Sequence, residues 1–220
     1  DQVQKEMSIL FSDIRSFTTL SESMSPEENF KFVNTYLSRM GPIVRDNHGY
    51  IDKYIGDSIM ALFDRSPEDA VNTSVKMLDA LREYNEERTQ EGNNPILIGI
   101  GVNTGKMMLG TLGESDRMEG SVISDAVNLA ARLEGLTKLY KTPLLLSEET
   151  LLKIGDSIFD TRLIDKVAVK GKENPVMVYE VLNGEYTDLR DAKISTLPKF
   201  KKGFELYQNQ QFKNALEFFK

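Results

Sequence analysis

Cysteine is absent from this chain of 220 residues. Its absence excludes disulfides, thiolate metal sites and cysteine nucleophiles together. Histidine is almost absent, because it occurs once, as His48 beside Gly49. Metal sites and catalytic triads that need several histidines are therefore excluded as well. We expect His48 to end a helix rather than to take part in catalysis.

Long apolar runs and an excess of basic charge are also missing. No stretch approaches the roughly 18 consecutive apolar residues that a membrane-spanning helix needs. The formal net charge of −7 disfavours wide nucleic-acid binding, which requires a basic face to displace counterions. With 40% hydrophobic and 28% charged residues, the composition is that of a soluble globular protein. We expect a cytoplasmic domain cut from a longer protein, whose other parts can hold a membrane anchor.

Strand-like runs and helical spacing alternate along most of the chain. The predicted elements are a strand over 7–13, a helix from 25 to 48, a hairpin of strands over 50–55 and 58–63, a helix from 66 to about 91, strands over 96–102 and 106–112, a helix over 124–140, a strand over 143–147, a short helix over 148–154, and strands around 167–169 and 176–182. Serine, proline and acidic residues open the first two helices, as is typical of helix N-termini. The β-α-β-β-α-β order predicts an α+β domain of the ferredoxin-like, palm-type class, with additions at its end.

The composition changes near residue 188, so we divide the chain into a domain over 1–187 and a helical segment over 188–220. Apolar residues in that segment have the spacing of an amphipathic helix, with a turn predicted at 209–211; they are Gly203, Phe204, Tyr207, Phe212, Ala215, Phe218 and Phe219. The spacing resembles the start of a tetratricopeptide repeat. The alternative is a single C-terminal helix that packs on the domain.

Two aspartates stand where apolar strand patterns end. Asp13 follows the first strand, and Asp57 lies at the tip of the predicted hairpin. Each alone is typical of a turn or a solvated strand end. Carboxylates at neighbouring strand tips can instead hold two divalent cations, which activate an attacking oxygen and neutralise a leaving oxygen at phosphorus. The shared position in one inferred sheet makes the metal-site interpretation as good as the structural one.

Polar residues elsewhere in the chain each allow a structural and a functional interpretation. Asn128 and Arg132 are four residues apart and share one face of the predicted third helix. That face is either solvated or free to line a cleft. Lys170 by itself is typical of a hairpin charge. The glycines near Lys106 do not have the spacing of the dinucleotide-binding fingerprint.

Four short motifs, in one order, resemble those of class III nucleotidyl cyclases. Residues 11–18 resemble the first metal motif, 53–57 the second, 127–132 the transition-state helix and 169–172 the late phosphate-binding strand. The match runs from about residue 8 to 181 and is closest to soluble, bicarbonate-responsive adenylyl cyclases, including multidomain cyanobacterial ones. The resemblance implies the class III cyclase fold and a head-to-tail homodimer with two equivalent clefts. In each cleft one subunit would supply the metals and the other most of the base and ribose contacts.

The resemblance also implies roles for residues near the two aspartates. Asp13 and Asp57 would hold two Mg²⁺ or Mn²⁺ ions, with the Ile14 carbonyl as an additional ligand, since hard cations prefer oxygen ligands. Backbone amides in the segment that includes Phe17 and Thr18 would hold the triphosphate.

The resemblance also implies roles for residues farther along the chain. Asn128 would position the ribose, and Arg132 would stabilise charge that develops on the α-phosphate. Lys170 would contact the γ-phosphate. Lys106 stands where many family members have arginine for the pyrophosphate, and lysine keeps that charge without the bidentate fork.

Base recognition would rest on Lys53 and Ser121. A lysine donor to N1 and a hydroxyl acceptor from the N6 amine fit adenine, whereas guanine presents the reversed pattern. Guanylyl cyclases usually have an acid at the position of Lys53, so the lysine favours ATP. A hydroxyl at Ser121 resembles the bicarbonate-responsive subgroup, which typically has threonine there, so bicarbonate is an expected effector.

The sequence therefore predicts an adenylyl cyclase, a lyase that converts ATP to cyclic AMP and pyrophosphate. The alternatives are a guanylyl cyclase and a non-catalytic nucleotide-binding dimerisation module. A diguanylate cyclase is disfavoured because its Gly-Gly-Asp/Glu-Glu-Phe hairpin is replaced by Tyr-Ile-Gly-Asp-Ser at 54–58.

Overall fold

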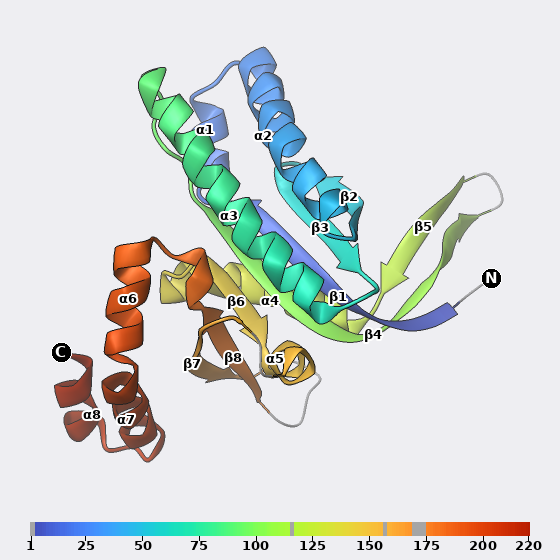
Figure 1. Cartoon of the computed structure of the whole chain (residues 1–220). Coiled ribbons are helices and arrows are strands. Elements are labelled where there is room, and N and C mark those ends of the chain that lie inside the picture. The colour runs from blue at the N-terminus through green and yellow to red at the C-terminus, as the bar shows by residue number, and fades with distance from the viewer. Residues whose placement is uncertain (1–2, 115–116, 156–157, 169–174) are drawn as a thin grey trace.

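The computed structural model describes residues 3–114, 117–155, 158–168 and 175–220, with only the backbone described at 111–114 and 117–123 (Figure 1). The strands are β1 Val3–Ile14, β2 Gly49–Ile55, β3 Ser58–Phe63, β4 Ile98–Glu114, β5 Arg117–Ile123, β6 Leu144–Ser147, β7 Thr161–Val167 and β8 Val176–Val181. The helices are α1 Phe17–Glu22, α2 Pro26–Asp46, α3 Pro67–Gln90, α4 Asp125–Tyr140, α5 Glu148–Ile154, α6 Thr187–Ser195, α7 Leu197–Gln208 and α8 Phe212–Phe219, with a 3-10 turn at Leu182–Gly184.

The strands of the described residues form one sheet in the order β2-β3-β1-β4-β6-β8-β7, and β5 extends it by pairing with β4. Neighbouring strands are antiparallel except for the parallel pair of β4 and β6. The first four strands, β2-β3-β1-β4, are linked through α2 and α3 in the order β-α-β-β-α-β, which is the ferredoxin-like arrangement. The predicted α+β palm-type class is confirmed.

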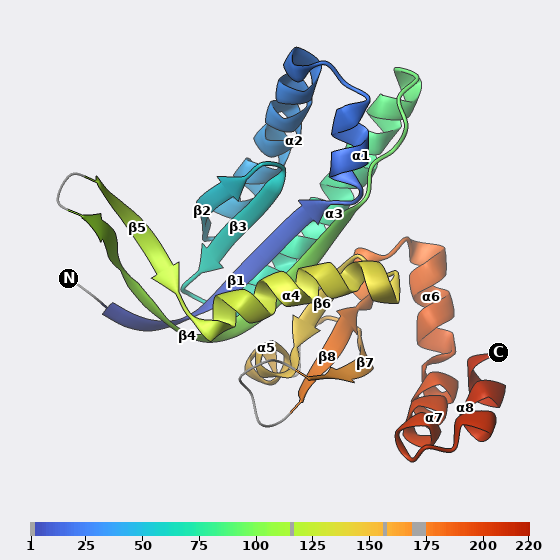
Figure 2. The ribbon, with the colours of Figure 1, turned by 180° about the vertical axis from the view of Figure 1, so that it is seen from behind.

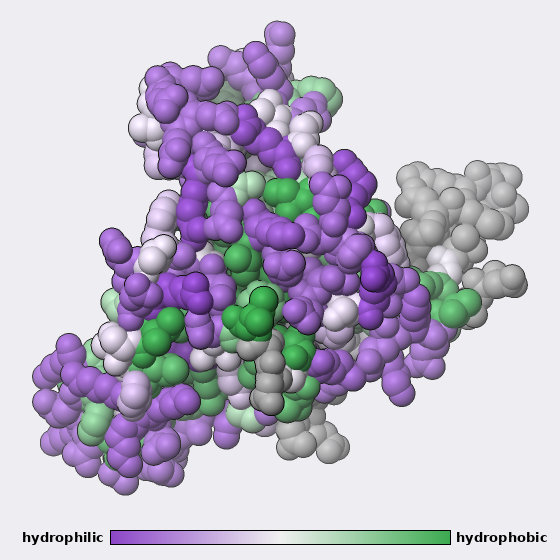
Figure 3. Space-filling model, in the orientation of Figure 1, coloured by the Kyte–Doolittle hydropathy of each residue, from purple (hydrophilic) through white to green (hydrophobic). Residues whose placement is uncertain are grey.

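Helices cover both faces of the sheet, with α2 and α3 on one face and α4 on the other (Figures 1 and 2). Successive side chains of a strand point to opposite faces, and β1 shows this alternation. Leu10 packs with the core residues of α2 and α3. Ile9 belongs to a second cluster that includes Ala130 of α4. The surface in Figure 3 is largely hydrophilic over α2 and α3.

The first long helix begins and ends where the sequence predicts. The Ser25 hydroxyl accepts a hydrogen bond from the Glu28 amide at 3.2 Å, and the Glu28 carboxylate accepts one from the Ser25 amide at 2.8 Å. This capping box satisfies two donors of the first turn. His48 follows the last turn with a φ of 65°, as expected of a helix-end residue. Met40 and Val44 of this helix are buried, whereas Phe30 near its N-terminus is 73% exposed.

The segment 98–114 departs from the prediction. Two strands joined at Thr104-Gly105 were expected, but β4 is continuous and its ladder with β1 passes through Gly105, which pairs with Met7. The glycines of β4 allow α4 to approach the strand closely, and they do not form a turn. A Cβ at Gly101 would lie 2.3 Å from the Glu134 nitrogen and 2.4 Å from the Ala130 oxygen of α4. The predicted strand at 167–169 is displaced too, since β7 starts at 161 and ends at 167.

The C-terminal segment forms three helices, and the predicted turn at 209–211 separates α7 from α8. The buried carboxylate of Glu180 on β8 ties α6 to the sheet, since it pairs with Arg162 at 2.8 Å and with Lys193 of α6. Burial raises the pKa of Glu180, but the hydrogen bond and charge of Lys193 outweigh it and leave the pKa below its ordinary value. Thr142, just past α4, donates to the same carboxylate at 2.9 Å. The assignment of this segment to a repeat stays a prediction.

Membrane insertion has no support in the helices. Each helix within the described ranges is too short or too polar to cross a bilayer.

The close approach of α4 to β4 generates a stability prediction. We expect Gly101→Ala to lower the free energy of unfolding by about 1–3 kcal/mol, because the new methyl group overpacks the helix backbone. Gly135→Ala, on the helix α4 that Gly101 contacts, is the control: a Cβ there meets no atom within 4 Å. It should raise stability by about 0.5–1 kcal/mol, through helix propensity. Urea unfolding of the two variants measures both changes, and equal effects would contradict the packing argument.

Candidate active site

The structure brings Asp13 and Asp57 together at one end of the sheet. Asp13 is the penultimate residue of β1, and Asp57 lies in the turn between β2 and β3, the strand that pairs with β1. The backbone amide of Ile14 donates a hydrogen bond to Oδ2 of Asp57 at 2.9 Å. Gly56 supplies the positive φ of 62° that the turn requires. The predicted pairing of strand end and hairpin tip is therefore present.

Electrostatic crowding marks this pair of aspartates. Asp57 is 6% exposed, and burial together with the adjacent Asp13 carboxyl raises the pKa of Asp57 to about 7. Two carboxylates in so little solvent repel each other, and a bound cation removes that repulsion. Carboxylate and carbonyl oxygens suit hard cations such as Mg²⁺ and Mn²⁺. The described residues contain no cluster of three or more His, Cys, Asp or Glu side chains, so further ligands would have to be the Ile14 carbonyl and groups outside the protein.

A tyrosine lies behind the two carboxylates. Tyr36 of α2 is fully buried, and its pKa is raised first by burial and then by the charges of Asp57 and Asp13. Its hydroxyl therefore stays protonated and presents a neutral polar group beside the acids. The sequence analysis missed Tyr36, because an aromatic residue within an apolar helical pattern is typical of a core.

The segment after β1 turns sharply into α1. Ser16 adopts a left-handed conformation with a φ of 55°, and α1 starts at Phe17. The Phe17 ring stacks on Phe32 of α2 at 6.4 Å between centroids, while Thr18 is exposed. Phe17 and Thr18 follow Asp13 closely in the chain, and their contact with a triphosphate stays a prediction.

The predicted polar face of α4 is free. Asn128 and Arg132 are exposed, whereas Leu129 and Leu133 on the other side of the helix are buried. Within the described part of the chain, neither polar side chain takes part in a hydrogen bond or an ion pair. The position of α4 along β4 is fixed near its N-terminus, where the Ser124 hydroxyl donates to the Lys106 carbonyl at 2.8 Å.

The remaining predicted residues are dispersed. Lys53 on β2 is exposed, and its Nζ lies 3.3 Å from Oδ2 of Asp52. Ser121 belongs to β5, where its backbone pairs with Gly110, but its side chain lies outside the described part. Lys106 is exposed on β4, at the edge of a hollow of about 520 Å³. Lys170 lies outside the described residues.

One chain does not assemble all of these residues into a single site. In the ladder between β1 and β4, Asp13 pairs with Gly99 and Glu6 pairs with Lys106. Seven residues separate these two pairs, so Lys106 lies roughly 24 Å from Asp13 at about 3.4 Å per residue. The acids form one group, and Lys106 with the N-terminal part of α4 forms another.

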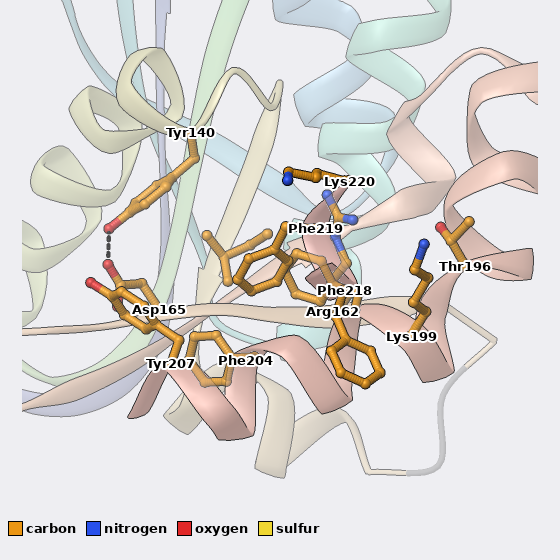
Figure 4. A pocket seen from close by; sticks show the side chains of 12 residues that line it. Tyr140, Arg162, Asp165, Thr196, Lys199, Phe204, Tyr207, Phe218, Phe219 and Lys220 are labelled. Atoms are coloured by element: carbon orange, nitrogen blue, oxygen red, sulfur yellow. Dashed lines mark hydrogen bonds between the residues drawn. The ribbon is translucent and has the colours of Figure 1, made fainter. Parts of the chain in front are cut away.

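An aromatic hollow of about 670 Å³ lies away from both groups, between α7, α8, β7 and the end of α4 (Figure 4). Tyr140, the last residue of α4, donates a hydrogen bond to Asp165 of β7 at 2.5 Å on one side of it. The hollow contains none of the predicted site residues, so it gives no support to the predicted chemistry.

Comparison with known proteins identifies relatives over most of the chain. Residues 1–183 match the family described as the adenylate and guanylate cyclase catalytic domain. The chain is 45% identical over 184 residues to an adenylate cyclase of Anabaena cylindrica, covering 80% of this chain and 37% of the relative. It is 39% identical over 226 residues to the terminal-differentiation-specific adenylate cyclase of Dictyostelium discoideum, covering 100% of this chain and 11% of the relative. The chain thus spans much less than half of either protein.

Solved structures show the same likeness. The adenylyl cyclase CyaB from P. aeruginosa has a TM-score of 0.74 at 32% identity, over 82% of this chain and 95% of that one. The guanylyl cyclase Cya2 has a TM-score of 0.71 at 34% identity, over 82% and 93% of the two chains. An adenylyl cyclase and a guanylyl cyclase therefore resemble this chain about equally well.

The crowded aspartates generate a prediction that needs no turnover. In a chelating buffer at pH 8, the free energy of unfolding of Asp57→Asn should be at least about 1.4 kcal/mol higher than that of the unchanged protein, because one of two repelling charges is gone; one pKa unit corresponds to about 1.4 kcal/mol. Added Mn²⁺ should raise the melting temperature of the unchanged protein but not of the variant. Asp64→Asn, which removes an exposed acid paired with Lys5, is the control and should keep the Mn²⁺ effect. A Mn²⁺ response that survives Asp57→Asn would contradict the cation site.

Proposed function

The chain belongs to the family of class III adenylyl and guanylyl cyclase catalytic domains, and from this premise we propose that it converts ATP to 3′,5′-cyclic AMP and pyrophosphate. The observation that carries the proposal is the pair Asp13 and Asp57, held together at one sheet end by the Ile14 amide. Family membership gives the reaction class, and the carboxylate pair provides what that reaction needs: a place for divalent cations beside a triphosphate.

The reaction would proceed by in-line attack. The 3′-oxygen of the ribose forms a bond to the α-phosphorus, the bond from that phosphorus to pyrophosphate breaks, and the 3′-hydroxyl gives its proton to Asp13 or to a water molecule. Asp13, Asp57 and the Ile14 carbonyl would hold two Mg²⁺ or Mn²⁺ ions, which would lower the pKa of the attacking hydroxyl and neutralise the phosphates. Backbone amides at Phe17 and Thr18 would bind the triphosphate.

Residues of α4 would act on the sugar and on the reacting phosphorus. Arg132 can place its charged fork against the α-phosphate oxygens, where negative charge grows in the transition state. Asn128, four residues earlier on the same face, can hydrogen-bond the ribose and keep the 3′-oxygen aligned. Both side chains are exposed, as this role requires.

We infer that each site is built from two copies of the chain. Lys106 and the aspartates lie too far apart within one chain to contact the same triphosphate, whose length is well below the ~24 Å implied by the strand register. A head-to-tail homodimer would place α4 and the base-reading residues of one subunit opposite the aspartates of the other. Two equivalent sites follow from that symmetry.

Guanylyl cyclase activity is the second candidate, because the guanylyl cyclase Cya2 is as similar as the adenylyl cyclases among the solved structures. We favour ATP because Lys53, on an exposed position of β2, can donate to adenine N1. The Ser121 hydroxyl can accept from the N6 amine. Guanine presents a donor at N1, which the Lys53 ammonium cannot accept, whereas the Ser121 hydroxyl can still donate to the guanine oxygen at C6, so the preference for ATP rests mainly on Lys53.

Substrate choice tests this assignment. With equal concentrations of ATP and GTP, the unchanged protein should form cyclic AMP in large excess. Lys53→Glu combined with Ser121→Cys should lower the ATP:GTP ratio of kcat/KM by about 10-fold or more, since each mismatched polar contact costs roughly 1–3 kcal/mol. Lys31→Glu, at an exposed position of α2, is the charge-matched control and should leave the ATP:GTP ratio unchanged. An unaltered ratio in the double variant would exclude base reading by these residues.

Mixing of two inactive variants tests the shared site. Asp13→Ala and Lys53→Ala proteins should each lose most activity, because each homodimer carries its defect in both clefts. A heterodimer places both defects in one cleft and leaves the other intact. Co-expressed with two different affinity tags and purified as the heterodimer, the mixture should regain about half of the unchanged activity per dimer.

The outcome against the shared site is equally definite. If purified heterodimers form and stay as inactive as the two homodimers, the aspartates and Lys53 act within one chain or not at all. The Asp13→Ala homodimer mixed with itself under two tags provides the background.

A further inference from the structure

Arg15 connects the end of β1 to α4. Its backbone amide donates to the Leu97 carbonyl at 2.7 Å, and its guanidinium reaches Glu134 of α4. One nitrogen donates to the Glu134 carboxylate at 2.9 Å and another to the Glu134 backbone carbonyl at 3.3 Å. The side chains of Arg15 and Glu134 are 20% and 13% exposed. This is a largely buried, two-point contact rather than a surface ion pair, so it fixes geometry.

Gly99 of β4 makes room for the contact. A Cβ at this position would lie 1.6 Å from a guanidinium nitrogen of Arg15 and 2.2 Å from the Thr137 hydroxyl oxygen of α4. The arginine therefore passes directly over the strand to reach the helix. Since Gly99 pairs with Asp13 in the sheet, the crossing point lies beside the first carboxylate of the proposed cation site.

The two ends of this contact carry different parts of the proposed chemistry. Arg15 is two residues from Asp13, and Glu134 is two residues from Arg132. In a head-to-tail dimer, which rests on the function proposed above, the aspartates of one chain serve one cleft and its α4 serves the other cleft. A contact within one chain thus joins the two clefts of the dimer.

We propose that Arg15 is a positioning residue, which holds α4 through Glu134 and so acts on the cleft to which its own chain gives no aspartates. α4 is the element to be held because it covers the sheet as an outer layer, whereas β1 is fixed between β3 and β4. The guanidinium is directed at α4, so it serves the phosphates only through the helix. A shift of about 1 Å in Arg132 would cost roughly 100-fold in rate.

The heterodimer with a single intact cleft isolates this effect. In a heterodimer of Asp13→Ala and Lys53→Ala chains, the Asp13→Ala chain gives the live cleft its α4 and its Lys53, and no cation ligand. Arg15→Met added to that chain should lower kcat about 10- to 100-fold with the KM for ATP changed less than about threefold. Lys138→Met, an exposed change on the same helix, is the control and should leave kcat unchanged.

Placement of the same change in the other chain decides between α4 and the cation site. Arg15→Met in the Lys53→Ala chain, which supplies the aspartates of the live cleft, should cost clearly less. A loss confined to that chain, or no loss in either, overturns the proposal. A heterodimer that is inactive before any change at Arg15 refutes the shared site instead, so the two failures are distinguishable.

Milder variants keep the test valid if Arg15→Met prevents assembly. Arg15→Lys retains a cation for the Glu134 carboxylate and loses the second contact, so kcat should fall between the unchanged and Arg15→Met values. Glu134→Gln in the Asp13→Ala chain should lower kcat in the same direction as Arg15→Met. If Glu134→Gln has no effect while either change at Arg15 is costly, Arg15 does not act through Glu134 and the proposal is wrong.

Discussion

The antiparallel pairing of β1 with both β3 and β4 is the constraint on which the rest of the structure depends. It puts β1 in the middle of the ferredoxin-like part of the sheet, so its alternate side chains enter both hydrophobic layers. Its register with β3 brings the end of β1 beside the β2–β3 turn, so that Asp13 and Asp57 lie close together. Its register with β4 sets where α4 lies, because α4 rests on the glycines of that strand.

The architecture was predictable wherever local signals and burial agreed. Ser25-Pro26-Glu27-Glu28 predicts a helix N-terminus, because a capping residue, a proline and acidic residues occur together. The apolar run before Asp13 predicts a buried strand. The prediction failed at β4. Glycine next to threonine is typical of a turn, but Gly101 and Gly105 lie within a strand that α4 covers closely. Contacts with a helix far along the chain decide that reading, and no local pattern contains them.

The candidate site was predictable only in part, and for a related reason. Asp13 and Asp57 could be paired from the sequence, because each ends a strand pattern and the strands join one sheet. The free face of α4 with Asn128 and Arg132 follows from helical spacing. Tyr36 and the contact of Arg15 with Glu134 could not be foreseen, since both depend on tertiary proximity between elements with ordinary local patterns. The aromatic hollow beneath α7 and α8 likewise arises from packing between distant segments.

The buried carboxylate of Glu180 has a consequence for the C-terminal helices. Arg162 pairs with Oε2 of this carboxylate, and Lys193 and Thr142 both donate to Oε1. A charge deprived of solvent tolerates the loss of a partner poorly, so detachment of α6, which removes Lys193, would destabilise the ionised form of Glu180. Thr142 lies two residues past Tyr140, the end of α4. One buried carboxylate thus joins α6 and β7 to the segment that directly follows α4.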